Sequence, residues 1–149
     1  MPHASDQSKT ETNRRSFLKT SVLAGGAALA GLSIQRGAHA AENNQLKVGL
    51  IGCGGRGTGA ARDALTADPN TVLTAMADAF EDRMAASHEN LVKQLGDRVQ
   101  VPKEKQFTGF DGYQKLIDSG VDVVLLCAPP HFRPQQLRAA VEAGKQIFC

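Results

Sequence analysis

Short apolar runs alternate with longer amphipathic stretches along the chain after residue 45. Runs of about four to eight apolar, often β-branched residues are typical of buried strands, whereas a helical spacing of apolar residues is typical of helices. The strands predicted from the runs lie at 46–51, 71–77, 98–101, 121–128 and 146–149. The helices predicted from the amphipathic stretches lie at 56–67, 80–95, 112–119 and 134–143.

The order of these elements predicts the fold class. Strand–helix–strand units that repeat along a chain form a parallel sheet with right-handed crossovers and helices on both faces. The run 121–128 is apolar at nearly every position, which is typical of a strand buried on both sides. We therefore expect a Rossmann-type doubly wound α/β domain. Its ligand should lie at the carboxyl ends of the strands, near the switch point between 46–51 and 121–128.

The first 40 residues have the layout of an export signal. Arg14 and Arg15 precede a mildly apolar stretch at 21–34, and Ala38-His39-Ala40 offers a small-x-small cleavage site. The apolar stretch is shorter than a membrane-spanning helix requires. The paired arginines followed by Phe17 and Leu18 resemble a twin-arginine signal, which exports proteins that have already folded.

This signal divides the chain into three predicted parts. We expect a twin-arginine signal peptide at 1–40, a polar linker at 41–45, and a nucleotide-binding domain at 46–149 that is incomplete at its C-terminal end. The mature chain would begin at Ala41. The expected partner during export is the twin-arginine translocase, and the expected location is the periplasm or another exported compartment.

Composition and charge exclude several classes of protein. Hydrophobic residues make up 42% of the chain and charged residues 21%, as in ordinary globular domains. The net charge is +2, but residues 1–40 hold five of the 17 Lys and Arg and two of the 15 Asp and Glu, which leaves −1 on the rest. The globular part therefore has no basic excess, and we expect no nucleic-acid partner.

A glycine-rich loop follows the first predicted strand and opens the first predicted helix. Its sequence at 52–57 is GCGGRG, which matches G-x-G-x-x-G. In this motif Gly52 allows a tight turn, Gly54 lets the backbone approach a pyrophosphate, and Gly57 lets helix and strand pack closely. The Arg56 side chain points either toward the pyrophosphate or into solvent. The candidate cofactor-binding residues of the loop are Gly52, Gly54, Gly55, Arg56 and Gly57.

An acidic residue ends the second predicted strand. Asp78 lies 21 residues after Gly57, where a carboxylate can accept a hydrogen bond from a ribose 2′-hydroxyl. The same carboxylate would repel a 2′-phosphate, which favours NAD as the cofactor over NADP; Arg83 nearby softens that preference. The alternative role for Asp78 is to cap the helix that begins near Phe80.

The loop after the strand at 121–128 supplies the remaining candidates. Ala128, Pro129 and His131 lie there, on the cofactor side of the predicted sheet. His131 either contacts the nicotinamide ribose or the substrate entrance, or is a loop residue without a role. The three cysteines lie too far apart in sequence for a zinc motif, and we expect them to be buried thiols. No metal site and no catalytic residue can be assigned.

These motifs together resemble the Gfo/Idh/MocA family of sugar and polyol oxidoreductases. The resemblance spans 46–149 and is carried by the glycine loop, the segment FDGYQKLI at 110–117, the segment APPHFRP at 128–134 and the ending GKQIFC at 144–149. The first three of these segments look most like the exported, twin-arginine branch. The resemblance implies NAD(P)-dependent hydride transfer on a small-molecule sugar or polyol, with this chain as the NAD-binding domain.

The chain also departs from the family pattern. Members continue after this last strand with Glu-Lys-Pro, whose lysine is catalytic, and then with a substrate domain through which oligomers form; the sequence stops before this point, at Cys149. We therefore expect a truncated or partial product, able to oligomerise only with the missing domain. Two alternative functions remain open, an NAD-dependent glycoside hydrolase of the same family and a non-catalytic nucleotide-binding fragment.

Overall fold

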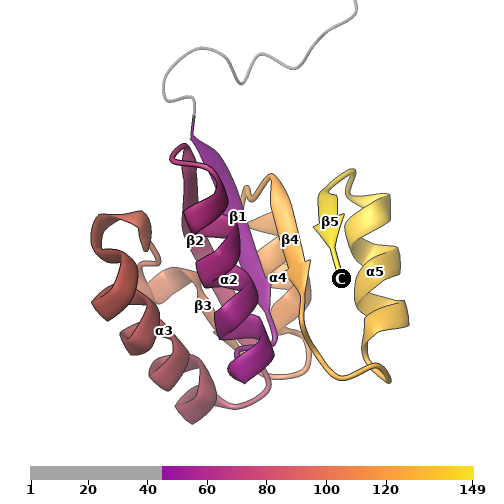
Figure 1. Ribbon diagram of the computed structural model, residues 1–149. Helices are drawn as coiled ribbons and strands as arrows, with labels where there is room; N and C mark the ends of the chain where they lie inside the picture. The colour runs from indigo at the N-terminus through magenta and orange to yellow at the C-terminus, as the bar shows by residue number, and fades with distance from the viewer. Residues whose placement is uncertain (1–44) are drawn as a thin grey trace, which may run out of the picture. The chain divides into compact units, whose positions relative to one another are not determined.

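The computed structural model describes residues 45–149, which form one five-stranded sheet with helices on both faces (Figure 1). The predicted signal peptide and most of the predicted linker lie outside the described residues. All neighbouring strands pair in parallel, in the order β3-β2-β1-β4-β5. The strands are β1 Leu46–Ile51, β2 Thr71–Asp78, β3 Gln106–Thr108, β4 Val123–Leu126 and β5 Gln146–Phe148.

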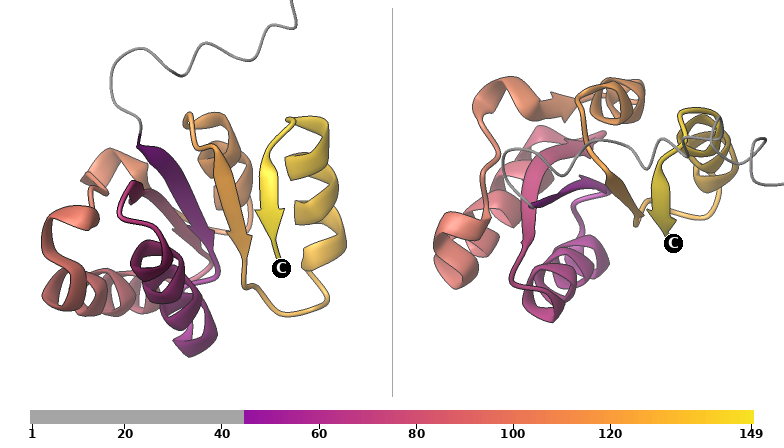
Figure 2. Two further views of the ribbon diagram at one scale, coloured as in Figure 1. Left: turned by 45° about the horizontal axis from the view of Figure 1, so that its top comes forward. Right: turned by 90° about the horizontal axis from the view of Figure 1, so that it is seen from above.

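Four helices connect the strands and confirm the predicted doubly wound α/β class. Seen along the sheet, α2 and α3 lie on one face and α4 and α5 on the other (Figure 2). Within residues 45–149 no helix is long and apolar enough to cross a membrane. The helices are α2 Gly55–Ala67, α3 Glu81–Leu95, α4 Gly112–Asp118 and α5 Arg133–Glu142, and two 3-10 turns are η1 Gly96–Arg98 and η2 Lys103–Lys105.

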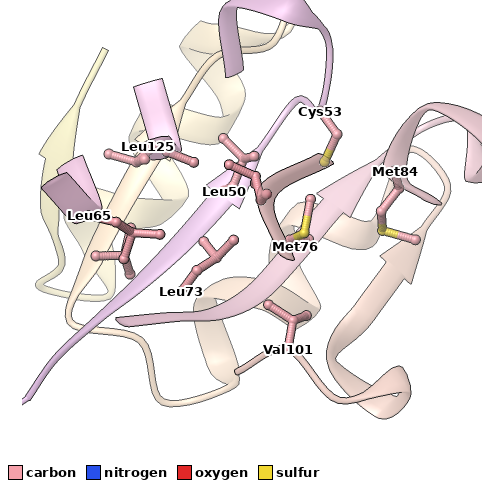
Figure 3. Close-up of a cluster of buried hydrophobic side chains, with 11 residues drawn as sticks. Leu50, Cys53, Leu65, Leu73, Met76, Met84, Val101 and Leu125 are labelled. Atoms are coloured by element: carbon pink, nitrogen blue, oxygen red, sulfur yellow. The ribbon is translucent and has the colours of Figure 1, made fainter. Parts of the chain in front are cut away.

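The sheet is buried on both faces by two apolar clusters. Leu50 packs into the cluster under α2 and α3, together with Leu65 and Met84 (Figure 3). The next residue, Ile51, points to the opposite face and packs into the cluster under α4 and α5. Because successive side chains of a strand alternate between the faces, a strand covered on both sides is apolar at every position. This explains why the buried part of β1, residues 48–51, contains no polar side chain.

The predicted strand at 98–101 is wrong. Helix α3 ends at Gly96, which has a φ of +53°, and the chain continues as the 3-10 turn η1 rather than as a strand. Val99 forms a single isolated bridge to Leu73, and Pro102 has no N–H to donate to a ladder. The third strand is β3, which pairs with the end of β2. The three residues of β3, Gln-Phe-Thr, are too few and too polar to form an apolar run that would predict a strand.

The topology places the switch point between β1 and β4, as predicted. Strand β1 pairs with β2 on one side and with β4 on the other. At the carboxyl end, the Gly52 N–H donates to Ala77 O at 2.8 Å, and the Cys127 N–H donates to Ile51 O at 2.8 Å. The ends of three strands are therefore held together where the glycine loop begins.

Candidate functional site

A cavity of about 460 Å³ opens at the carboxyl ends of β1, β2 and β4. Its walls are the glycine loop, the start of α3, the loop that precedes α4, and the segment that leads from β4 into α5. A cavity of this size falls within the range of roughly 300–1,000 Å³ that small-molecule sites occupy. The cavity lies where a parallel sheet with this topology binds its ligand.

Two glycines of the loop are required by its geometry. Gly52 has a φ of +92°, and a Cβ there would lie 2.6 Å from Ala128 N. Gly57 is buried behind the loop, and a Cβ there would lie 1.8 Å from Gly52 O. Both contacts are with backbone atoms, which cannot rotate away as the end of a side chain can. The first turn of α2 therefore rests directly against the end of β1.

The N-terminus of α2 is open toward the cavity. The first helical hydrogen bond runs from the Thr58 N–H to Gly54 O at 2.9 Å, so the three N–H groups before it, from Gly55 to Gly57, have no intrahelical partner. Within the described residues no side chain caps this end, and the first turn of α2 contains no acidic residue. Free N–H groups together with the helix dipole make a site for a phosphate-like anion.

The tip of the loop leaves room for such an anion. At Gly54 and Gly55 a Cβ would meet no atom of the described residues within 4 Å. Both glycines line the cavity, and the exposed side chain of Arg56 lines it beside them. Arg56 is thus both exposed and part of the cavity lining, and contact of its side chain with a pyrophosphate stays a prediction. Its guanidinium adds positive charge next to the open helix end.

Asp78 links the glycine loop to the start of α3. Its Oδ2 accepts a hydrogen bond from the Cys53 N–H at 2.6 Å, and its Oδ1 accepts one from the Phe80 N–H at 3.0 Å. The carboxylate also lines the cavity. An ionised carboxylate has about four acceptor positions, so these two bonds leave capacity for a ligand's hydroxyl groups. Binding the backbone of Phe80 and binding a ligand are therefore compatible roles.

The cysteines take three different environments. Cys53 is buried under the loop, and its Sγ donates a weak hydrogen bond to Ala77 O at 3.6 Å. Burial, and then the charge of Asp78, raise the pKa of the Cys53 thiol, which therefore stays protonated. Burial also raises the pKa of Cys127, which is half-buried in the cavity wall. Cys149 is exposed, so the expectation of three buried thiols is wrong for this residue.

The structure brings most of the predicted cofactor-binding residues to one cavity, although their roles stay predictions. Gly57 supports the loop from behind instead of lining the cavity. His131 is exposed, lies outside the cavity lining, and packs edge-on against Phe132 at 5.3 Å between ring centroids. Among residues 45–149 no group of metal-ligating side chains occurs. The predicted residues that line the cavity are Gly52, Gly54, Gly55, Arg56, Asp78, Ala128 and Pro129.

Aromatic side chains form a rim around the cavity, and the sequence pattern did not predict them. Phe110 is 71% exposed and stacks on Phe132, with ring centroids 5.8 Å apart. Phe80 is 54% exposed, and the guanidinium of Arg83 lies 5.2 Å from its ring centroid. All four side chains line the cavity. Exposed aromatic faces at the mouth of a cavity are suited to covering a planar ring.

Comparison with known proteins identifies the family. Residues 46–149 match the sequence model of a family described as "Oxidoreductase family, NAD-binding Rossmann fold". The chain belongs to this family, Gfo/Idh/MocA. The predicted resemblance is thereby confirmed at the level of the family, while its exported branch stays a prediction. A search of curated proteins found no match.

Solved structures of Gfo/Idh/MocA type share the fold. The apo scyllo-inositol dehydrogenase of Lactobacillus casei is 25% identical, with a TM-score of 0.53 over 72% of this chain and 28% of that one. The myo-inositol 2-dehydrogenase of Lactobacillus plantarum is 25% identical, with a TM-score of 0.54 over 70% of this chain and 27% of that one. A probable dehydrogenase of Thermotoga maritima is 29% identical, with a TM-score of 0.52 and the same coverage of 70% and 27%. The chain thus matches little more than a quarter of the length of these relatives.

The cavity fits the dinucleotide that the family name implies. The uncapped N-terminus of α2 offers free N–H groups to a pyrophosphate. The glycines at the tip of the loop leave space for it. Asp78 lies beside this point, bound to the loop itself, with acceptor positions for a ribose diol. The aromatic side chains of the rim, which come from the segments before α3, α4 and α5, complete the cavity lining.

Proposed function

We propose that this chain is the NAD-binding part of an exported oxidoreductase that acts on a sugar or polyol by hydride transfer. Membership of a family of NAD-binding oxidoreductases supports the reaction class. The inositol dehydrogenases among the similar structures support a polyhydroxylated substrate. The substrate and the hydride transfer belong to the longer proteins of the family, since this chain matches about a quarter of their length.

One observation carries the NAD part of the proposal. A hydrogen bond of 2.6 Å joins the Cys53 N–H of the glycine loop to the Asp78 carboxylate, so a phosphate site and a ribose site are fixed relative to each other. A dinucleotide presents a pyrophosphate and a ribose diol at neighbouring positions, which match these two sites. When bound, the nicotinamide supplies the hydride acceptor. The residues of this chain bind and orient the dinucleotide.

The carboxylate of Asp78 also supports NAD over NADP. A 2′-phosphate placed next to this carboxylate would bring two negative charges together at the edge of the cavity. Arg83 opposes this effect, because its guanidinium also lines the cavity, but it already lies over the ring of Phe80. We therefore propose NAD as the cofactor, with measurable but weaker binding of NADP.

Calorimetry with the 149-residue chain tests this proposal. We expect the chain to bind NAD, and to bind NADP about tenfold more weakly, which corresponds to about 1.4 kcal/mol of unfavourable charge interaction. The measurement is a titration of the chain with each dinucleotide in the same buffer. Absence of heat with both dinucleotides would contradict NAD binding, and tighter binding of NADP would contradict the role given to Asp78.

Export is tested separately in bacteria. The paired arginines support transport by the twin-arginine translocase, and the small residues before Ala41 support cleavage there. We expect the exported protein to begin at Ala41, and a variant with both Arg14→Lys and Arg15→Lys to remain in the cytoplasm at full length. N-terminal sequencing and fractionation measure both results. An exported protein that begins at Met1 would contradict the proposal.

A further inference from the structure

Two hydroxyl groups connect α3 with the glycine loop. The hydroxyl of Thr58, in the first turn of α2, donates a hydrogen bond to Gly54 O at 3.0 Å. Its oxygen lies 2.7 Å from the hydroxyl oxygen of Ser87, on α3. A hydroxyl has a single hydrogen, and that of Thr58 is used on Gly54 O, so Ser87 donates and Thr58 accepts. The hydrogen bonds therefore run in one direction, from Ser87 through Thr58 to the carbonyl of Gly54.

Ser87 is a polar residue on an otherwise apolar helix face. It is 4% exposed and lies on the buried face of α3 with Met84 and Leu91, which both belong to the apolar cluster around Leu50. Two hydroxyls bonded to each other in such a place add little net stability, because an apolar pair of the same shape is about as stable. The hydroxyl pair therefore points to a role beyond the packing of α2 against α3.

The carbonyl at the end of these bonds fixes the direction of a free N–H group. Gly54 O and the Gly55 N–H belong to one trans peptide unit, so they point in opposite directions. Gly54 O accepts from the N–H of Thr58, at 2.9 Å, and from its hydroxyl, so this oxygen points into α2. The Gly55 N–H consequently points out of the helix end. Rotation of this peptide unit would place a carbonyl oxygen, which repels an anion, where the N–H now lies.

The two glycines themselves offer little resistance to this rotation. A Cβ on Gly54 or Gly55 would meet no atom of the described residues within 4 Å, and glycine adopts a wide range of backbone angles. The peptide unit is therefore held by the hydrogen bonds to Gly54 O. The bond from the Thr58 N–H is common to all α-helices, whereas the bond from the hydroxyl depends on the side chains of Thr58 and Ser87.

We propose that Thr58 and Ser87 are positioning residues that keep the Gly55 N–H directed toward a bound pyrophosphate. This inference rests on the proposed NAD site. Neither side chain lines the cavity, so both act through the carbonyl of Gly54 instead of touching the ligand. Ser87 orients the Thr58 hydroxyl, and the Thr58 hydroxyl prevents rotation of the peptide unit between Gly54 and Gly55.

Substitutions at Thr58 test this role by calorimetry with NAD and the 149-residue chain. Thr58→Val keeps the branched shape and removes the hydroxyl, and we expect it to weaken NAD binding about threefold to tenfold. Thr58→Ser restores the hydroxyl, and its affinity should lie within about twofold of wild type. Thr66→Val is the matched control, because the exposed Thr66 hydroxyl makes the same kind of bond at the other end of α2, to Arg62 O at 2.7 Å. We expect this control to bind NAD as the wild type does.

A double variant separates positioning from stability. Thr58→Val alone leaves the buried Ser87 hydroxyl without a partner, which lowers the melting temperature, whereas Thr58→Val combined with Ser87→Ala leaves no hydroxyl unpaired. We expect thermal unfolding of the double variant to return toward that of the wild type, while NAD binding stays about threefold to tenfold weaker. Recovery of NAD affinity together with stability would overturn the inference, as would wild-type affinity in Thr58→Val.

A measurement without ligand distinguishes this inference from the proposed function. By ¹⁵N relaxation, we expect the Gly55 N–H to lose order in the double variant and to keep it in Thr58→Ser, while the Gly59 N–H is unchanged in both. Unchanged order of the Gly55 N–H in the double variant would overturn the inference and leave NAD binding intact. A wild-type chain that showed the expected order but bound no NAD would overturn the proposed function and leave the effect of the hydroxyls on the peptide unit standing.

Discussion

Replacing Gly57 by alanine is expected to abolish NAD binding and to destabilise the domain by about 3 kcal/mol or more. The added Cβ would lie 1.8 Å from Gly52 O, and neither backbone can move without separating α2 from the end of β1. The displaced helix would no longer present its free N–H groups at the tip of the loop. Chemical denaturation measures the change in the free energy of unfolding, and calorimetry measures the loss of NAD binding.

A second glycine of the same helix provides the control. At Gly59 a Cβ would meet no atom of the described residues within 4 Å, and the position lies inside α2. Gly59→Ala is expected to stabilise the domain by about 0.5–1 kcal/mol, because alanine loses less conformational freedom than glycine in a helix. NAD binding should be unchanged. Wild-type affinity in Gly57→Ala would show that the close contact between helix and strand does not determine the site.

The parts of the fold that follow from local pattern could be predicted from the sequence. Strand β1 and the glycine loop lie next to each other in the chain, so one stretch of sequence contains both the buried run and its turn. Asp78 could be placed because it ends an apolar strand at a known distance from the loop. Strand β3 could not, since its three residues pair with β2 through contacts that no local periodicity records.

The rest of the site depends on contacts between distant segments. Phe110 and Phe132 belong to different loops and stack only because α4 and α5 pack on the same face of the sheet. Gln136, another residue of the cavity lining, is a polar residue on a polar helix, and nothing in the sequence distinguishes it from Gln135, although one is buried and the other exposed. His131 follows a strand end but lies outside the cavity lining, so its contact with the cofactor stays a prediction.

Asp78→Asn is expected to weaken NAD binding about tenfold to one hundredfold while reducing NADP binding much less. The substitution removes the charge that binds the ribose diol and repels a 2′-phosphate. The amide that replaces the carboxylate can still accept from the Phe80 N–H through its oxygen, but its amino group cannot also accept from the Cys53 N–H. Some loss of loop order is therefore expected with both dinucleotides, and the informative quantity is the ratio of the two affinities.

That ratio separates the two roles of the carboxylate. If Asp78 acts only by holding the loop and the start of α3, then NAD and NADP affinities fall in parallel and their ratio is unchanged. If it also binds the ribose, the preference for NAD decreases, because Arg83 remains in the cavity to attract the 2′-phosphate. Asp82→Asn is the control for long-range charge: Asp82 lies in the first turn of α3, is exposed and does not line the cavity. An equal change of the ratio in both variants would attribute the preference to net charge instead of to contact with the ribose.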